Sequence, residues 1–205
     1  MSGEKKKSSL IKDALVLFAI TLIAALALGA VYEITKDPIE EAHAKAKTDA
    51  AKAVYPDMSE TKTPESGVID KANALISADS TIDSVTIDEI LFALDENGNK
   101  IGEIITVTSK KGYGGAITTM MGVSDDGTLK GIEFLSISET PGLGMKAKDD
   151  TFKDQFKGVN TDSFSLEKRN IKGSTPIDAI SSATITTTAV TNMLNAGLKA
   201  AASID

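Results

Sequence analysis

An uncharged apolar run at residues 14–32, ALVLFAITLIAALALGAVY, restricts the fold of this chain more than any other feature. Thr21 is its one polar interruption before the terminal Tyr32. As a helix rising about 1.5 Å per residue, the run extends roughly 28 Å, close to the roughly 30 Å hydrocarbon thickness of a bilayer. The sequence therefore predicts a single N-terminal transmembrane helix.

A cleaved signal peptide is the competing interpretation. A basic start precedes the run, and Ala25-Leu26-Ala27 or Leu28-Gly29-Ala30 resembles a small-residue cleavage site. The apolar core of a signal peptide is shorter, about 7 to 15 residues. The length of the run favours a retained membrane anchor.

The basic residues indicate how the anchor is oriented. Lys5, Lys6, Lys7 and Lys12 all precede the run, and the positive-inside rule keeps such residues in the cytoplasm. We expect a single-pass protein of the inner (cytoplasmic) membrane with its larger part outside. The expected parts are a cytoplasmic N-terminus (1–13), the transmembrane helix (14–32), a juxtamembrane helix and linker (33–80), and an extracytoplasmic domain (81–205).

Charge and composition exclude several classes of function. The chain carries 22 basic and 29 acidic residues, a net charge of −7. Because the first 13 residues are net positive, the outer part is more acidic still, so we expect no nucleic acid among its partners. The absence of Cys excludes disulfides, thiolate catalysis and cysteine-ligated iron–sulfur clusters within this chain. The single His43 cannot build a zinc or bis-histidine haem site.

Helical patterns lie on both sides of a segment with a period of two. An Ala-rich, charged helix is expected between Pro38 and Pro56, and a short helix near 68–77. Helical character returns at 147–158, where Phe152 and Phe156 are four apart, and at 185–202.

The central segment predicts an antiparallel meander. Turn signals separate four strand-like runs, at 84–94, 101–109, 114–123 and 128–137. The fold class is therefore α+β, with an antiparallel sheet covered by helices.

Two glycine-rich clusters are candidate ligand sites, Lys111-Gly112-Tyr113-Gly114-Gly115 and Ser138 to Lys146, SETPGLGMK. Each has a structural interpretation, a bulged strand start for the first and a type II turn at Pro141-Gly142 for the second. Glycines also let a backbone approach a flat ligand closely.

A third cluster, DAISSATITT at 178–187, places five hydroxyls directly before the C-terminal helix. A helix cap or a β-rich edge is the structural interpretation, although an ordinary cap needs only one hydroxyl. Free N–H groups and the helix dipole also favour an anion at this position, so a phosphate esterified to a Thr here would be stabilised.

These clusters carry a family resemblance. DAISSAT resembles the Asp-x-x-(Ser/Thr)-Gly-Ala-Thr motif of the FMN-binding domain family, in which a flavin transferase joins FMN through its phosphate to the final Thr. ETPGLG and GYGG are similar to signatures of the RnfG component of Rnf complexes and of its relative NqrC, a component of the sodium-pumping NADH:quinone oxidoreductase. The resemblance covers about 84–202 and extends to the anchor. Ser182 departs from it, because the motif usually has Gly there.

The resemblance implies a set of cofactor residues. Thr184 would carry FMN through a phosphoester, while Asp178 and Ser181 would be read by the transferase or shape the turn with Ser182. The flavin would be lined by residues of the two glycine clusters: Glu139, Thr140, Gly142, Leu143, Gly144, Gly114 and Gly115. No catalytic acid, base or metal site is expected.

The resemblance also implies a function. The chain would be a membrane-anchored subunit that relays electrons through covalent FMN in an Rnf-type ferredoxin:NAD⁺ oxidoreductase, an ion-pumping translocase whose other subunits are its partners. The alternatives are a stand-alone extracytoplasmic flavinylated carrier, an NqrC-like subunit, or an adaptor whose turns and hydroxyls are purely structural.

Overall fold

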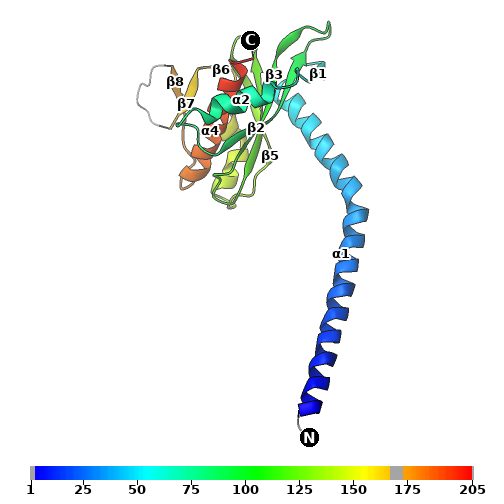
Figure 1. The fold of residues 1–205 in the computed structure, drawn as a ribbon. Helices are drawn as coiled ribbons and strands as arrows, with labels where there is room; N and C mark the ends of the chain where they lie inside the picture. The colour runs from blue at the N-terminus through cyan, green and yellow to red at the C-terminus, as the bar shows by residue number, and fades with distance from the viewer. Residues whose placement is uncertain (1–2, 167–172, 205) are drawn as a thin grey trace. The chain divides into compact units, whose positions relative to one another are not determined.

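The structure is a computed structural model that describes residues 3–166 and 173–204 (Figure 1). The chain divides into two compact units, residues 1–46 and residues 47–205. The first unit consists of one helix, and the second contains the end of that helix together with all of the sheet and the remaining helices.

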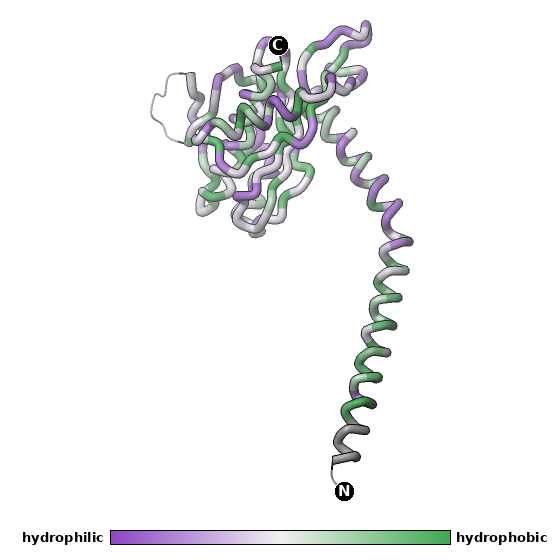
Figure 2. Tube along the Cα trace, viewed as in Figure 1, coloured by the Kyte–Doolittle hydropathy of each residue, from purple (hydrophilic) through white to green (hydrophobic). Residues whose placement is uncertain are grey.

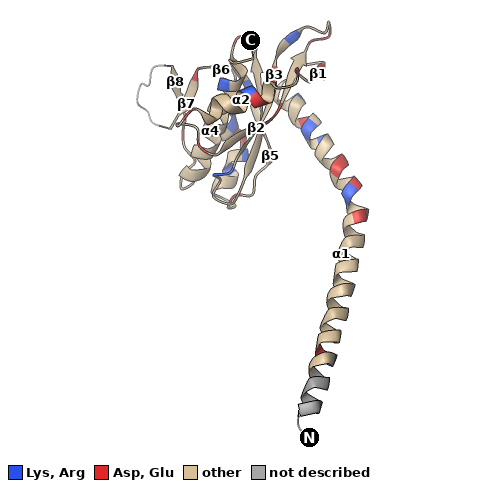
Figure 3. Cartoon of the chain, in the orientation of Figure 1, with Lys and Arg blue, Asp and Glu red and all other residues tan. Residues whose placement is uncertain are grey.

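The N-terminal helix, α1 (Gly3–Val54), contains the apolar run. Among residues 3–166 and 173–204, α1 is the one helix that is long and apolar enough to cross a membrane. Figure 2 shows its apolar stretch, and Figure 3 shows that charged residues are absent from that stretch and return toward the end of the helix. These features agree with the predicted span.

A separate helix beginning at Pro38 was expected, and that interpretation is wrong. Pro38 lies inside α1, which continues without a break to Val54. A proline inside a helix removes one backbone hydrogen bond. The Ala-rich sequence after it favours helix strongly enough for α1 to continue.

The domain is built on one antiparallel sheet of six strands in the order β1-β2-β3-β4-β5-β6. The strands are β1 (Glu60–Lys62), β2 (Val85–Leu94), β3 (Lys100–Ser109), β4 (Ile117–Ser124), β5 (Thr128–Ser136) and β6 (Val159–Asn160). The four long strands confirm the predicted meander. The predicted third strand begins three residues late, because Gly114 and Gly115 lie in the loop before β4.

A helical layer covers one face of the sheet. It consists of α2 (Val68–Ser77) and α4 (Thr184–Ala201), both expected from the sequence. From α4, Val190, Met193 and Leu194 join Ile105 and Met121 of the central strands in the main core. Gly197 permits the contact, since a Cβ added there would lie 2.1 Å from the sulfur of Met121.

The end of α1 covers part of the opposite face. Ala50, Ala51 and Val54 form a second apolar cluster with Ile104 and Met120. Strand glycines make the approach possible: a Cβ added at Gly122 would lie 2.7 Å from the carbonyl oxygen of Val54. The last turns of α1 are therefore part of the domain.

The helix expected over 147–158 is replaced by three short elements, η1 (Gly144–Lys148), α3 (Asp150–Lys153) and η2 (Asp154–Phe156). The backbone of Asp149, between η1 and α3, is extended, so the prediction of one continuous helix is wrong. The expected aromatic pair is present: the rings of Phe152 and Phe156 pack edge to face, with their centroids 5.3 Å apart. Phe156 also contacts Phe164 of β7 (Ser163–Ser165), which pairs in parallel with β8 (Ser174–Pro176). Packing of these rings, rather than helix propensity, fixes the segment.

Tyr55 ends α1 and joins it to the sheet. Its ring is 2 % exposed, and its hydroxyl donates a hydrogen bond to the carbonyl oxygen of Ile101. Burial, helped by the carboxylate of Asp125, raises the pKa of Tyr55 to about 12.

We expect Tyr55→Phe to lower the free energy of unfolding by about 1 kcal/mol, because it leaves the Ile101 carbonyl without its donor. In the unfolded chain a Tyr ionises near pH 10, and in the fold it ionises near pH 12. This part of the stability is therefore complete below pH 10 and is lost as the pH rises toward 12. Urea unfolding of the full chain in detergent at pH 8 and pH 11 measures both effects. If Tyr55→Phe loses as much stability between pH 8 and pH 11 as the unmodified chain does, groups other than Tyr55 cause the alkaline loss.

Candidate functional site

A cavity of about 490 Å³ opens at the N-terminus of α4. Two loops and the first turn of the helix form its walls. It is lined by Tyr113, Glu139, Thr140, Leu143, Gly144, Ser182, Ala183, Thr184, Ile185 and Thr186. The fold thus brings together Glu139, Thr140, Leu143, Gly144, Ser182 and Thr184 of the predicted set, which are separated by about 40 positions in the sequence.

The N-terminus of α4 presents free hydrogen-bond donors to this cavity. The helix begins at Thr184, its N-cap Ala183 offers no side-chain cap, and the first helical bond runs from the amide of Thr187 to Ala183. The amides of Thr184, Ile185 and Thr186 have no acceptor among the described residues. Such amides, with the helix dipole, favour an anion.

The hydroxyls of the 178–187 cluster have different environments. Thr187 is buried, where its Oγ1 donates to Ala183 at 2.9 Å and accepts from the amide of Ile180 at 3.1 Å. Thr186 is buried against the cavity, while Thr184 is exposed and lines it. Thr187 therefore fixes the turn, which leaves the hydroxyl of Thr184 accessible at the helix start.

Ser182 adopts a left-handed backbone conformation, with φ 61°. This region favours glycine, which agrees with the Gly that the motif usually has at this position. The side chain of Ser182 is exposed, so a glycine at this position would remove no buried contact. Ser182 therefore holds, with some backbone strain, a conformation that glycine adopts freely.

The loop before η1 contains the expected tight turn. The amide of Leu143 donates to the carbonyl oxygen of Thr140 at 3.1 Å, and Gly142 has φ 77°, as a type II turn requires at its third position. The turn places Thr140 and Leu143 on the cavity, with Leu143 40 % exposed. Gly142 shapes the loop but does not line the cavity.

Glu139 is a buried carboxylate in the cavity wall, 6 % exposed. Its Oε1 accepts from the amide of Gly114 at 3.3 Å. Glycines make space for it, because a Cβ added at Gly112 would lie 2.7 Å from Oε1, and one at Gly144 would lie 2.7 Å from Oε2. Both glycine clusters therefore surround this carboxylate.

Four predicted residues besides Gly142 lie outside the cavity. Gly114 lets the two loops touch, since a Cβ added there would lie 2.0 Å from the carbonyl oxygen of Ser138. Gly115 lies in the same loop and has φ 135°. Asp178 and Ser181 are exposed. The backbone of Asp178 bonds Gln155 at 2.8 Å and 3.3 Å, which ties the segment before α4 to η2.

The sequence interpretation missed four residues that line the cavity, Tyr113, Ala183, Ile185 and Thr186. Within residues 47–166 and 173–204, the exposed large apolar side chains are Leu75 and three that line the cavity, Tyr113, Leu143 and Ile185. A signal was available at Tyr113, an aromatic residue between two glycines. Ile185 gave none, because its exposure depends on how α4 docks.

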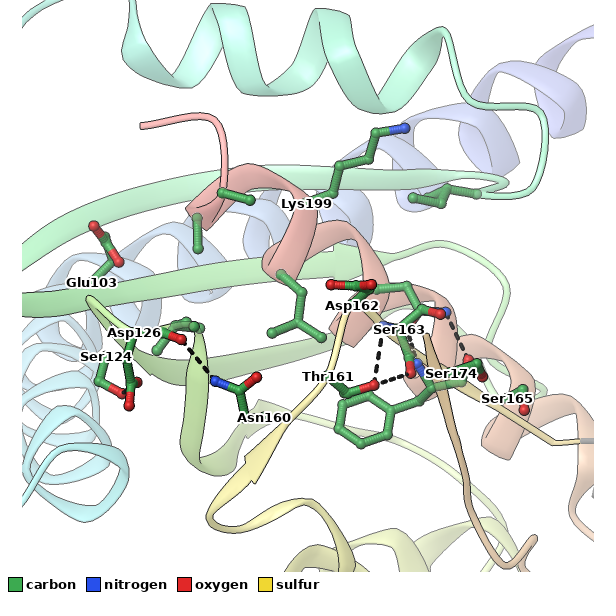
Figure 4. Close-up of a pocket in the computed structure, with 18 of the residues that line it drawn as sticks. Glu103, Ser124, Asp126, Asn160, Thr161, Asp162, Ser163, Ser165, Ser174 and Lys199 are labelled. Atoms are coloured by element: carbon green, nitrogen blue, oxygen red, sulfur yellow. Dashed lines mark hydrogen bonds between the residues drawn. The ribbon is translucent and has the colours of Figure 1, made fainter. Parts of the chain in front are cut away.

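A larger cavity, about 770 Å³, lies at the other end of α4 (Figure 4). Its lining includes five carboxylates, Asp79, Glu103, Asp125, Asp126 and Asp162, against one lysine, Lys199. A hydrogen bond from Lys199 holds the pKa of Asp79 well below its usual range. No group of three or more potential metal ligands occurs among the described residues. The acidic lining disfavours a phosphate here, so the cavity at Thr184 is the candidate site.

Comparisons with known proteins agree with this choice. Residues 112–199 match a family described as the FMN-binding domain, and residues 1–54, which include all of α1, match the RnfG N-terminal region. The first match spans every residue that lines the cavity at Thr184.

Two relatives match along most of their length. The G subunit of the Na⁺-translocating ferredoxin:NAD⁺ oxidoreductase complex of Acetobacterium woodii is 30% identical over 92% of this chain and 89% of its own. The G subunit of the ion-translocating oxidoreductase complex of Methanosarcina acetivorans is 28% identical over 97% of this chain and 96% of its own. Among solved structures, NqrC of Shewanella oneidensis gives a TM-score of 0.45 at 18% identity, covering 71% of this chain and 69% of that one. The family assignment therefore rests on the sequence relatives.

The left-handed turn at Ser182 leads to a matched pair of variants. Ser182→Gly should leave the domain at least as stable, because Gly adopts φ 61° without strain. Ser182→Val should lower the free energy of unfolding by about 1 to 3 kcal/mol, since a β-branched residue is strained there. Urea unfolding of both variants compares them. Equal stability would mean that the turn relaxes out of the left-handed region.

Proposed function

The chain belongs to the RnfG family, the G subunits of ion-translocating ferredoxin:NAD⁺ oxidoreductase complexes, and from this we propose that it relays electrons through FMN held covalently at Thr184. One observation carries the attachment site. The hydroxyl of Thr184 lies at the uncapped start of α4, beside three amides without acceptors among the described residues and on a cavity large enough for a cofactor.

The donor set fits the phosphate of FMN. A phosphate esterified to Oγ1 of Thr184 would carry its negative charge at the positive end of α4, where the amides of Thr184, Ile185 and Thr186 are available. The described lining of the cavity supplies no Lys or Arg at this end. Helix amides would therefore be the main partners of the phosphate.

The remaining lining fits a flat apolar ring with a polar edge. Tyr113, Leu143 and Ile185 expose apolar surface around the cavity, while Thr140 offers a hydroxyl. In this proposal Leu143 packs on the isoalloxazine ring and Thr140 contacts its polar edge. Bound FMN would supply the redox chemistry, and the chain would tether it, orient it and adjust its potential.

The proposal includes the membrane and the partners. The apolar run of α1 would anchor the chain as a single-pass protein, and by the positive-inside rule Lys5, Lys6, Lys7 and Lys12 would keep its N-terminus in the cytoplasm. The partners would be the other subunits of the complex. A flavin transferase would attach FMN, and the exposed Asp178 and Ser181 beside Thr184 are the side chains it would read.

Two comparisons favour an RnfG-type subunit over an NqrC-like subunit or a solitary carrier. The relatives named as G subunits match this chain over nearly its whole length, and the RnfG N-terminal region matches α1 in addition to the FMN-binding domain match at 112–199. Co-purification with several multi-span proteins would separate a complex subunit from a solitary carrier.

Thr184→Ala should give a folded, membrane-bound protein without covalent flavin. The side chain is exposed, so its loss should change stability by less than about 0.5 kcal/mol. The measurement is intact-mass spectrometry of full chain produced together with a flavin transferase. Thr188→Ala is the control, because Thr188 is an exposed Thr one helical turn further along α4. An FMN-sized mass increment that persists in Thr184→Ala would exclude the proposed site.

The orientation is tested separately with protease added outside spheroplasts or protoplasts. The chain beyond residue 33 should be digested in intact cells, because the basic residues of the N-terminus remain inside. A cytoplasmic protein serves as the lysis control. Protection of the domain until lysis would reverse the proposed topology.

A further inference from the structure

We propose that the carboxylate of Glu139 sets the reduction potential of the flavin by holding a negative charge in the wall of its cavity. The inference rests on the proposed function and assigns to Glu139 an electrostatic role that goes beyond contact with the cofactor. Three properties of the residue support it.

First, Glu139 is the only charged residue among the described residues that line the cavity at Thr184. The other lining residues are apolar, hydroxyl-bearing or glycine. A single charge in such surroundings is weakly screened, so it acts on whatever fills the cavity more strongly than a surface charge would.

Second, the carboxylate lacks a cationic partner among the described residues. Its one hydrogen bond there is the 3.3 Å contact from the amide of Gly114 to Oε1, and no described Lys or Arg pairs with it. A buried charge without a partner is costly, and most buried carboxylates are paired. The fold therefore keeps at the cavity a carboxylate that gains no ion pair from the described residues.

Third, the surrounding backbone is shaped to hold the carboxylate where it is. Gly112 and Gly144 leave the space that its two oxygens occupy. Thr186 is buried and makes no side-chain hydrogen bond among the described residues. It also lies close to Gly144, since a Cβ added at Gly144 would be 2.6 Å from Oγ1 of Thr186. Any side chain at Gly144 would displace one of these two polar groups.

The consequence follows from Coulomb's law. A ring that gains an electron beside a fixed negative charge is harder to reduce, so Glu139 lowers the midpoint potential of a flavin in this cavity. At an effective dielectric constant of about 20, one unit charge changes the equilibrium for adding one electron at least about tenfold at separations up to about 12 Å. A tenfold change equals about 59 mV for a one-electron step.

The test is redox titration of flavin-loaded full chain in detergent. Glu139→Gln keeps the shape of the side chain and an oxygen for the Gly114 amide but removes the charge, so it should raise the midpoint potential by at least about 59 mV, a tenfold shift. Two controls should shift it several-fold less. Thr186→Val removes a polar group from the same place without changing charge, and Glu89→Gln removes a carboxylate that pairs with Lys47 on the α1-covered face.

Mass spectrometry separates this inference from the proposed function. If the unmodified chain carries no FMN-sized increment, the proposed function fails and this inference fails with it. If Glu139→Gln carries the increment and its potential is unchanged, or shifts no more than the controls, the inference alone is overturned. If Glu139→Gln never acquires FMN, the carboxylate serves attachment and the electrostatic role is likewise overturned.

Discussion

The packing of α4 across the central strands is the contact on which the site depends. Val190, Met193 and Leu194 anchor the helix in the main core, and Gly197 lets its backbone lie against Met121. Because these contacts fix the middle and the end of the helix, its first turn is held at the cavity without a side-chain cap. The free amides beside Thr184 are therefore a product of core packing, and burial far from the site supports a local arrangement that is unfavourable by itself.

The walls of the cavity come from two loops that contribute little core of their own. Glycines make them compatible: Gly114 permits contact with Ser138, while Gly112 and Gly144 leave space for the carboxylate of Glu139. The same glycines that suggest close contact with a ligand thus serve mainly to bring loop to loop. Gly112 and Gly114 act on the site only indirectly, while Gly144 lines the cavity together with Tyr113, Thr140 and Leu143.

The two faces of the sheet serve different purposes. One is covered by α2 and α4 and holds the main core, and the other receives the end of α1 through Val54 and Tyr55. Because α1 is continuous through Pro38, the helix that contains the membrane anchor ends as a structural part of the domain, with no separate linker helix.

The sequence alone determined the features that depend on local pattern. The length of the apolar run predicted the long N-terminal helix, and period-two alternation with turn residues predicted β2 to β5. The hydroxyl cluster before a helix predicted only an anion-favouring helix start, and it was the family resemblance that singled out Thr184. The resemblance to a family of FMN-binding domains was readable for the same reason, since its motifs are short and contiguous. Tertiary structure decided the rest. It divided 147–158 among three short elements, in which the ring of Phe156 packs edge to face against both Phe152 and Phe164. It also exposed Tyr113 and Ile185 and buried Glu139, because burial is set by contacts between segments far apart in the chain, which no local pattern encodes.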